Sequence, residues 1–170
     1  MTKLFTPLHV GRMELANRIA MAPMTRYRAS DNHVPLPIMK DYYAQRASVP
    51  GTLLITEATT ISARAGGYAN APGIYNDAQI AAWKEVTDAV HAKGSYIYVQ
   101  LWAVGRPANP QLLQAEGGYD LVSSSATAVS ADAPTPRALS ETEIYAWIAD
   151  YAQAARNAVA AGFDGVEIHA

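Results

Sequence analysis

Four short segments of the chain end in side chains that could bind and orient a small ligand. Thr25 follows an apolar run that closes with Pro-Met, and Ala58 follows Glu57 at the end of a second run. Gln100 interrupts the apolar stretch Tyr-Ile-Tyr-Val-Gln-Leu-Trp, and His169 closes Gly-Val-Glu-Ile-His. If these runs are parallel strands, their C-terminal ends meet at one edge, where β/α barrels place their active sites.

Each of these side chains also has a structural interpretation. Thr25 could cap a helix or a turn, and Trp102 could pack in the core or under a loop. The amide of Gln100 needs hydrogen-bond partners, which either a heterocycle or the backbone would supply. His169 is equally compatible with a structural histidine. For Glu167, whose side chain faces the opposite way from that of Ile168, we expect a structural ion pair.

Other common catalytic signals are missing from the sequence. His9, His33 and His91 do not form a metal-ligand spacing with His169, so we expect no metal site. Cysteine is absent, which excludes disulfides, a thiolate nucleophile and a Cys-ligated metal. The chain contains no P-loop and no G-x-G-x-x-G motif after a strand.

The order of expected elements is a hairpin followed by strands that alternate with helices. Helix ends are indicated by Asn76 or Asp77, by the capping box Ser140-Glu-Thr-Glu143, and by Gly94 and Gly162. A segment rich in Pro, Ser, Gly and Ala, residues 102–138, is either functional or carries small elements of its own. We expect a hairpin within 8–20, strands at 18–22, 51–56, 96–101 and 164–169, and helices at 38–47, from 76 or 77 to before 94, and from 140 to 162.

This alternation predicts an α/β fold with a parallel sheet. A complete (β/α)8 TIM barrel needs roughly 250 residues. We therefore predict one unit over residues 1–170, the N-terminal half of such a barrel, with the hairpin, strands 1–4 and helices 1–3. A small open α/β sheet is the alternative.

Composition excludes several classes of protein. Hydrophobic residues make up 50% of the chain and charged residues 16%, which excludes a disordered chain and fits a buried parallel sheet. The net charge is −2 without a Lys/Arg cluster, so we expect no nucleic-acid partner. No apolar run approaches the roughly 18 residues of a membrane helix, and the N-terminus lacks the apolar core of a signal peptide. A cytoplasmic protein without a membrane partner fits these features.

An ordered set of motifs along essentially the whole chain resembles the Old Yellow Enzyme family of FMN-dependent ene reductases. The threonine after Pro-Met is similar to that of the family's classical branch, where another branch has cysteine. The motifs are Leu4-Phe-Thr-Pro-Leu8, Leu15-Ala-Asn-Arg-Ile19, Ala22-Pro-Met-Thr-Arg-Tyr-Arg28, Tyr42-Tyr-Ala-Gln-Arg46, Ile55-Thr-Glu-Ala58, Ala65-Gly-Gly-Tyr68, Val99-Gln-Leu-Trp102 and Gly162-Phe-Asp-Gly-Val-Glu-Ile-His-Ala170.

The resemblance implies cofactor-binding roles for five residues. The backbone around Pro23 and Met24 would lie along the flavin. Thr25 is similar to the threonine whose hydroxyl bonds to the flavin O4 and tunes its potential. Ala58 would leave room for the isoalloxazine, and Gln100 would pair with its pyrimidine edge.

The resemblance also implies a substrate pocket and a reaction. Tyr68 and Trp102 would shape the pocket over the flavin, and His169 would be the first of two donors to a substrate carbonyl or nitro oxygen. Such donors favour the negative charge that develops on this oxygen as hydride arrives at the β-carbon. The implied activity is hydride transfer from NAD(P)H through FMN to the activated C=C bond of an enone or nitro substrate.

The family's second substrate donor, its proton-delivering tyrosine, a fifth-strand arginine and the phosphate site all come later than Ala170 in the family pattern. We therefore expect activity to need a complementary C-terminal half-barrel polypeptide. Two alternatives stay open: an inactive structural half-barrel, and a flavin-dependent isomerase of specialised metabolism.

Overall fold

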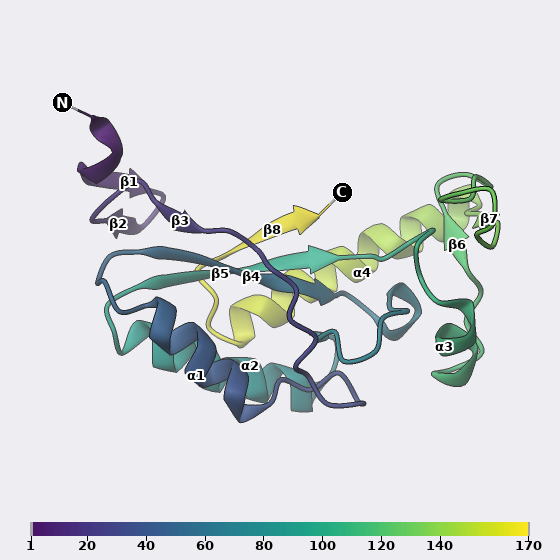
Figure 1. Cartoon of the computed structure of the whole chain (residues 1–170), viewed down its shortest axis with the longest axis horizontal. Helices are drawn as coiled ribbons and strands as arrows, with labels where there is room; N and C mark the ends of the chain where they lie inside the picture. The colour runs from purple at the N-terminus through teal and green to yellow at the C-terminus, as the bar shows by residue number, and fades with distance from the viewer. Residues whose placement is uncertain (1, 170) are drawn as a thin grey trace.

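The centre of the molecule is a four-stranded parallel sheet (Figure 1). The computed structural model describes residues 2–169. The sheet order follows the chain, as expected for consecutive β/α units. The strands are β3 (Ala20–Met21), β4 (Leu53–Thr60), β5 (Tyr96–Trp102) and β8 (Gly165–His169).

Three helices cover one face of this sheet (Figure 1). They are α1 (Pro37–Arg46), α2 (Asp77–His91) and α4 (Glu141–Ala160). The expected caps are confirmed, because Asn76 accepts a bond from the Gln79 N–H and Ser140 and Glu143 form a capping box. Side chains from alternate strand positions fill the space under the helices and make the main core. This core includes Leu54, Ile97, Val99 and Leu101 of the sheet and Tyr43, Trp83, Ala154 and Ala158 of the helices.

The other face of the sheet is formed by the remaining strand positions, since successive side chains alternate. Register places Ala58 beside Gln100 and Gln100 beside Glu167. The next row contains Thr60, Trp102 and His169. We call this surface, with its rows of residues from β4, β5 and β8, the inner face.

Two local features shape the inner face. A register shift between Ile55 and Ala58 inserts one extra residue into β4, and this turns Ala58 to the same side as Gln100. At the N-terminal end of β8, a Cβ at Gly165 would collide with the ring of Tyr98. Only glycine therefore allows β8 to lie against that ring.

The N-terminal hairpin lies at the opposite end of the sheet from His169. Its strands are β1 (Leu8–Val10) and β2 (Met13–Leu15), preceded by the short helix η1 (Lys3–Phe5). The Glu14 N–H donates to the hydroxyl of Tyr96 at 3.3 Å, and the Ala16 N–H donates to the carbonyl of Gly51 at 3.0 Å. The expected hairpin is thus confirmed and is bonded to the N-terminal ends of β4 and β5.

The long connection between β5 and α4 carries small elements, as expected. These are α3 (Pro110–Ala115), β6 (Val122–Ser123) and β7 (Arg137–Ala138), and a further short helix, η2 (Ala63–Ala65), follows β4. They lie beyond the ends toward which β4 and β5 point (Figure 1). The connection therefore belongs to the end of the sheet where the predicted site residues gather.

The predicted half of a β/α barrel is confirmed, but the bounds of two strands differ from the prediction by more than one residue. The first strand is paired only over Ala20–Met21 instead of over 18–22. The second does not stop at Thr56 and continues to Thr60, so Glu57 and Ala58 lie inside it. The polar run Thr-Glu-Ala-Thr-Thr looks like a strand end, yet these side chains are buried and its polar members are hydrogen-bonded inside the fold.

Among the helices of residues 2–169, none has the length and apolar character that a bilayer crossing needs.

Candidate functional site

Three of the predicted substrate-binding residues form a stack of rings at the C-terminal ends of the strands. The rings of Tyr68 and Trp102 are 5.5 Å apart and inclined by 16°. The rings of Trp102 and His169 are 5.7 Å apart and inclined by 12°. Because these residues follow or end three different strands, the structure brings together side chains that are far apart in sequence.

Tyr27 extends this stack and was not among the residues predicted from sequence. Its ring centre lies 5.9 Å from that of Tyr68, at an angle of 42°. Burial, followed by the neighbouring Tyr68 and Glu57, raises the pKa of the Tyr27 hydroxyl. Its backbone has φ +52°, a left-handed conformation that no pattern in the sequence indicates. We call Tyr27, Tyr68, Trp102 and His169 the ring row.

Ala58 and Gln100 lie side by side on the inner face, next to the ring row. Gln100 as a whole residue is only 8% exposed. Its backbone N–H donates to the Thr56 hydroxyl at 3.1 Å, but within residues 2–169 its side-chain amide has no hydrogen-bond partner. The amide of a residue as little exposed as this one usually has a hydrogen-bond partner. A heterocycle with alternating donors and acceptors would satisfy it, so the residues fit a flavin ring at this position.

Pro23, Met24 and Thr25 lie in the extended connection that leaves β3. The side chain of Met24 is exposed, and that of Thr25 is half-buried. In the part of the chain that the structure describes, the Thr25 hydroxyl caps neither a helix nor a turn and makes no hydrogen bond. It is therefore available to a ligand.

Glu57 holds this connection in place, although the sequence indicated it only as a strand-end residue. Its Oε2 accepts hydrogen bonds from the N–H groups of Arg26 at 2.9 Å and Tyr27 at 3.3 Å. Burial raises the pKa of the Glu57 carboxyl, although these bonds partly oppose the shift. The signal that could have identified it is a carboxylate in the middle of a buried strand, which needs specific partners.

The structural ion pair expected for Glu167 is not formed within residues 2–169. One carboxylate oxygen, Oε2, is instead buried without a hydrogen-bond partner. The side chain lies on the inner face beside Gln100, and β8 has only β5 as a neighbour there. No cationic side chain of residues 2–169 therefore pairs with this carboxylate.

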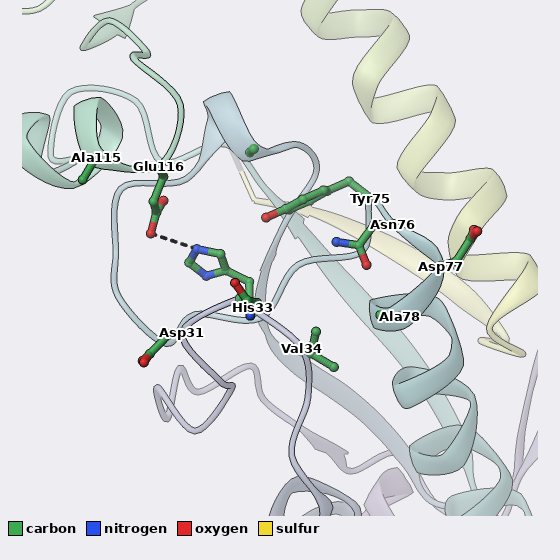
Figure 2. Close-up of a pocket in the computed structure, with 11 residues that line it drawn as sticks. Asp31, His33, Val34, Tyr75, Asn76, Asp77, Ala78, Ala115 and Glu116 are labelled. Carbon is green, nitrogen blue, oxygen red and sulfur yellow. Dashed lines mark hydrogen bonds and ion pairs between the residues drawn. The ribbon is translucent and has the colours of Figure 1, made fainter.

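A separate cavity contains none of the predicted site residues. It has a volume of about 830 Å³ and is lined by side chains that include Asp31, His33, Tyr75 and Glu116 (Figure 2). Nδ1 of His33 is 2.7 Å from the carbonyl oxygen of Ala71, and Nε2 is 3.0 Å from the Glu116 carboxylate. This histidine ties the connection after β3 to the end of α3. Within residues 2–169, no group of three or more His, Cys, Asp or Glu side chains is arranged to hold a metal ion.

Comparisons with known proteins agree with this geometry. The NADP-dependent oxidoreductase lnbE of Aspergillus flavus is 64% identical over 99% of this chain and 45% of its own length. The probable inactive reductase easA of Epichloe festucae var. lolii is 61% identical over 99% of the chain and 44% of its own. The chain thus spans a little under half the length of these curated relatives.

The fold comparison points the same way. The crystal structure of Old Yellow Enzyme from Pichia sp. AKU4542 superimposes with a TM-score of 0.95 at 42% identity, over 99% of this chain and 46% of that one. The sequence model of the NADH:flavin oxidoreductase / NADH oxidase family matches residues 3–170. With nearly every residue inside that match and the half-barrel superimposed on an Old Yellow Enzyme, the chain belongs to the NADH:flavin oxidoreductase / NADH oxidase family.

Proposed function

We propose that this chain forms the flavin-binding and substrate-binding half of an ene reductase that oxidises NADPH. The substrate would be an α,β-unsaturated carbonyl or nitro compound, reduced at its activated C=C bond. Family membership implies FMN as cofactor and NADPH as reductant. The observation that carries the proposal is the ring row beside the unpartnered amide of Gln100, at the strand ends where barrel enzymes act.

Five residues would hold the cofactor. The side-chain amide of Gln100 and the hydroxyl of Thr25 offer hydrogen bonds, and the methyl group of Ala58 leaves space next to Gln100. The backbone of Pro23 and Met24 would border the ring. FMN, when bound, supplies the group that accepts hydride from NADPH and donates it to the substrate.

The ring row would bind and orient the substrate. His169 can donate an N–H to the carbonyl or nitro oxygen, where negative charge develops during hydride transfer. Because Trp102 is stacked on the imidazole, the plane of this donor is set before the substrate arrives. Tyr68 and Tyr27 continue the apolar surface on the far side of Trp102.

A chimera tests the proposal directly. Residues 1–170 are joined to the part of lnbE that lies outside its match to this chain; we call this protein the completed barrel. It should bind FMN, turn yellow and consume NADPH in the presence of an enone. A folded completed barrel that fails to bind FMN would contradict the proposal. Mixing the two pieces as separate polypeptides tests whether a complementary half-barrel can act as a partner.

A second candidate function is a flavin-binding protein without reductase activity. It is favoured by the name of easA, a 61% identical relative described as a probable inactive reductase. An FMN-loaded completed barrel that neither oxidises NADPH nor reduces enones would support this alternative. Conversion of an enone to an isomer without NADPH consumption would instead support an isomerase.

A further inference from the structure

Glu57 is a buried carboxylate with no part in the proposed binding of flavin or substrate. The residue is 1% exposed and lies in the middle of β4. Within residues 2–169 it forms no ion pair, and all of its hydrogen-bond partners are backbone N–H groups and one tyrosine hydroxyl. Burying such a group is costly unless the bonds that it makes are needed.

These bonds form a clamp between β4 and the connection that follows β3. Oε2 accepts from the N–H groups of Arg26 and Tyr27, at 2.9 and 3.3 Å. Oε1 lies 3.5 Å from the hydroxyl of Tyr43, which in turn accepts the N–H of Glu57 at 2.9 Å. One oxygen of the carboxylate therefore contacts Tyr43 of α1, and the other accepts the two N–H groups of the connection.

The clamp positions two residues of the proposed site, Thr25 and Tyr27. Thr25 directly precedes Arg26, so its hydroxyl is placed by the first of the two clamped N–H groups. Tyr27 adopts φ +52°, which is unfavourable for a residue with a side chain. In this conformation its ring lies 5.9 Å from that of Tyr68, so the clamp also places one member of the ring row.

We infer that Glu57 is a positioning residue that sets Thr25 and Tyr27 relative to Ala58, its neighbour in β4. It acts through the backbone of Arg26 and Tyr27 and does not itself touch the flavin. This inference rests on the proposed function, because Thr25 and Ala58 are assigned there to FMN. It adds that one carboxylate couples the two strand ends between which the cofactor would lie.

Four variants of the completed barrel separate positioning from charge and from core stability. Glu57→Met fills a similar volume but offers no carbonyl or carboxylate acceptor, and Glu57→Ala is a second way to remove the clamp. Glu57→Gln loses the charge but keeps an oxygen that can accept both N–H groups. Thr87→Val is the control, because it removes another buried bond, 2.7 Å from the Thr87 hydroxyl to the Ala161 carbonyl, away from the site.

The first measurement is hydrogen exchange at the backbone amides of Arg26 and Tyr27 in the flavin-free protein. Exchange should be roughly tenfold faster or more in the Met and Ala variants, because the acceptor of both N–H groups is lost. It should stay close to wild type in Glu57→Gln and Thr87→Val. Unchanged exchange in folded Met or Ala variants overturns the clamp.

The second measurement is FMN affinity, followed by flavin fluorescence, together with the midpoint potential. FMN should bind about tenfold more weakly to the Met and Ala variants, with a shifted potential, and Glu57→Gln should restore both. Faster exchange with unchanged affinity and potential overturns the positioning role. Loss of fold in both the Met and Ala variants, with a folded Gln variant, would assign Glu57 to core stability and also overturns it. Failure of the wild-type completed barrel to bind FMN refutes the proposed function instead, and the exchange result still tests the clamp.

Discussion

The imidazole of His169 lies almost parallel to the Trp102 ring, so its orientation depends on a side chain from the neighbouring strand. In the completed barrel, His169→Ala should weaken the binding of an anionic phenol roughly tenfold, as expected for a lost hydrogen bond to a charged oxygen. Reoxidation of the flavin by an enone should slow, because this bond strengthens as charge develops. Reduction by NADPH should suffer less. Stopped-flow kinetics and phenol titration measure these effects.

A structural histidine would behave differently in the same experiment. His169→Ala would then reduce stability or flavin content, while the phenol dissociation constant per folded, flavin-loaded molecule would match that of wild type. Equal dissociation constants would remove His169 from the substrate site.

Thr25 offers a second test at the scale of one residue. Removing one hydrogen bond to the flavin ring should change the relative stability of its two redox states by about 0.5–1.5 kcal/mol. Thr25→Ala should therefore shift the midpoint potential by roughly tens of millivolts. Thr25→Ser keeps the hydroxyl and is the matched control. A potential that does not move in the alanine variant would exclude the proposed bond.

At the scale of elements, the Glu57 carboxyl joins β4 to the connection after β3, and its contribution to folding stability should depend on pH. Burial raises the pKa of Glu57 above its ordinary value of 4.5. The folded state thus holds the proton more tightly than the unfolded state, so this group's contribution to stability is complete below pH 4.5 and is lost as pH rises through the raised pKa. Glu57→Gln lacks this titration.

The prediction concerns the difference in unfolding free energy between wild type and Glu57→Gln. It should shift in favour of the glutamine variant as pH rises from about 4.5 toward neutrality. Denaturant unfolding of the completed barrel at several pH values measures this difference. A difference that stays constant, or that moves toward wild type, would contradict the raised pKa.

The elements themselves could be predicted largely from local sequence. Apolar runs marked the four strands, and Asn76, the Ser140–Glu143 box and Gly162 marked helix ends, because each of these signals acts within a few residues. The end of β4 could not be predicted. Its polar residues are satisfied by distant groups, such as the bond between Glu57 and Tyr43, which lie 14 positions apart.

Part of the candidate site could also be predicted from the sequence. The resemblance indicated Tyr68, Trp102 and His169, and the structure stacks their rings. Tyr27 and the clamp by Glu57 were missed for one reason. Both depend on a left-handed backbone conformation and on contacts between separate β/α units, which leave no periodic pattern in the sequence.

At the scale of the whole molecule, the sheet of residues 2–169 ends in two edge strands, β3 and β8. Ile168 and Val166 of β8 are 63% and 36% exposed on the side that faces the helices elsewhere in the sheet. Open edges with apolar side chains invite pairing with another chain. The isolated 170-residue polypeptide should therefore self-associate, whereas the completed barrel should not show association through these edges.

Sedimentation velocity over a range of concentrations tests this expectation. The isolated polypeptide should show species that grow with concentration and a broad thermal transition. A monodisperse monomer with a cooperative melt at modest concentration would show that the edges are protected in some other way.

The division of the site between strands and connections has an evolutionary consequence. Ala58 and Gln100 lie inside strands, where neighbours on both sides restrict substitution, whereas Tyr27 and Tyr68 lie on connections that vary more freely. Selection can therefore change the Tyr27 and Tyr68 part of the surface proposed for the substrate while Ala58 and Gln100 stay the same. A gene duplicate of such a protein could acquire a new substrate, or lose its reaction altogether, through a few changes in these connections and without refolding.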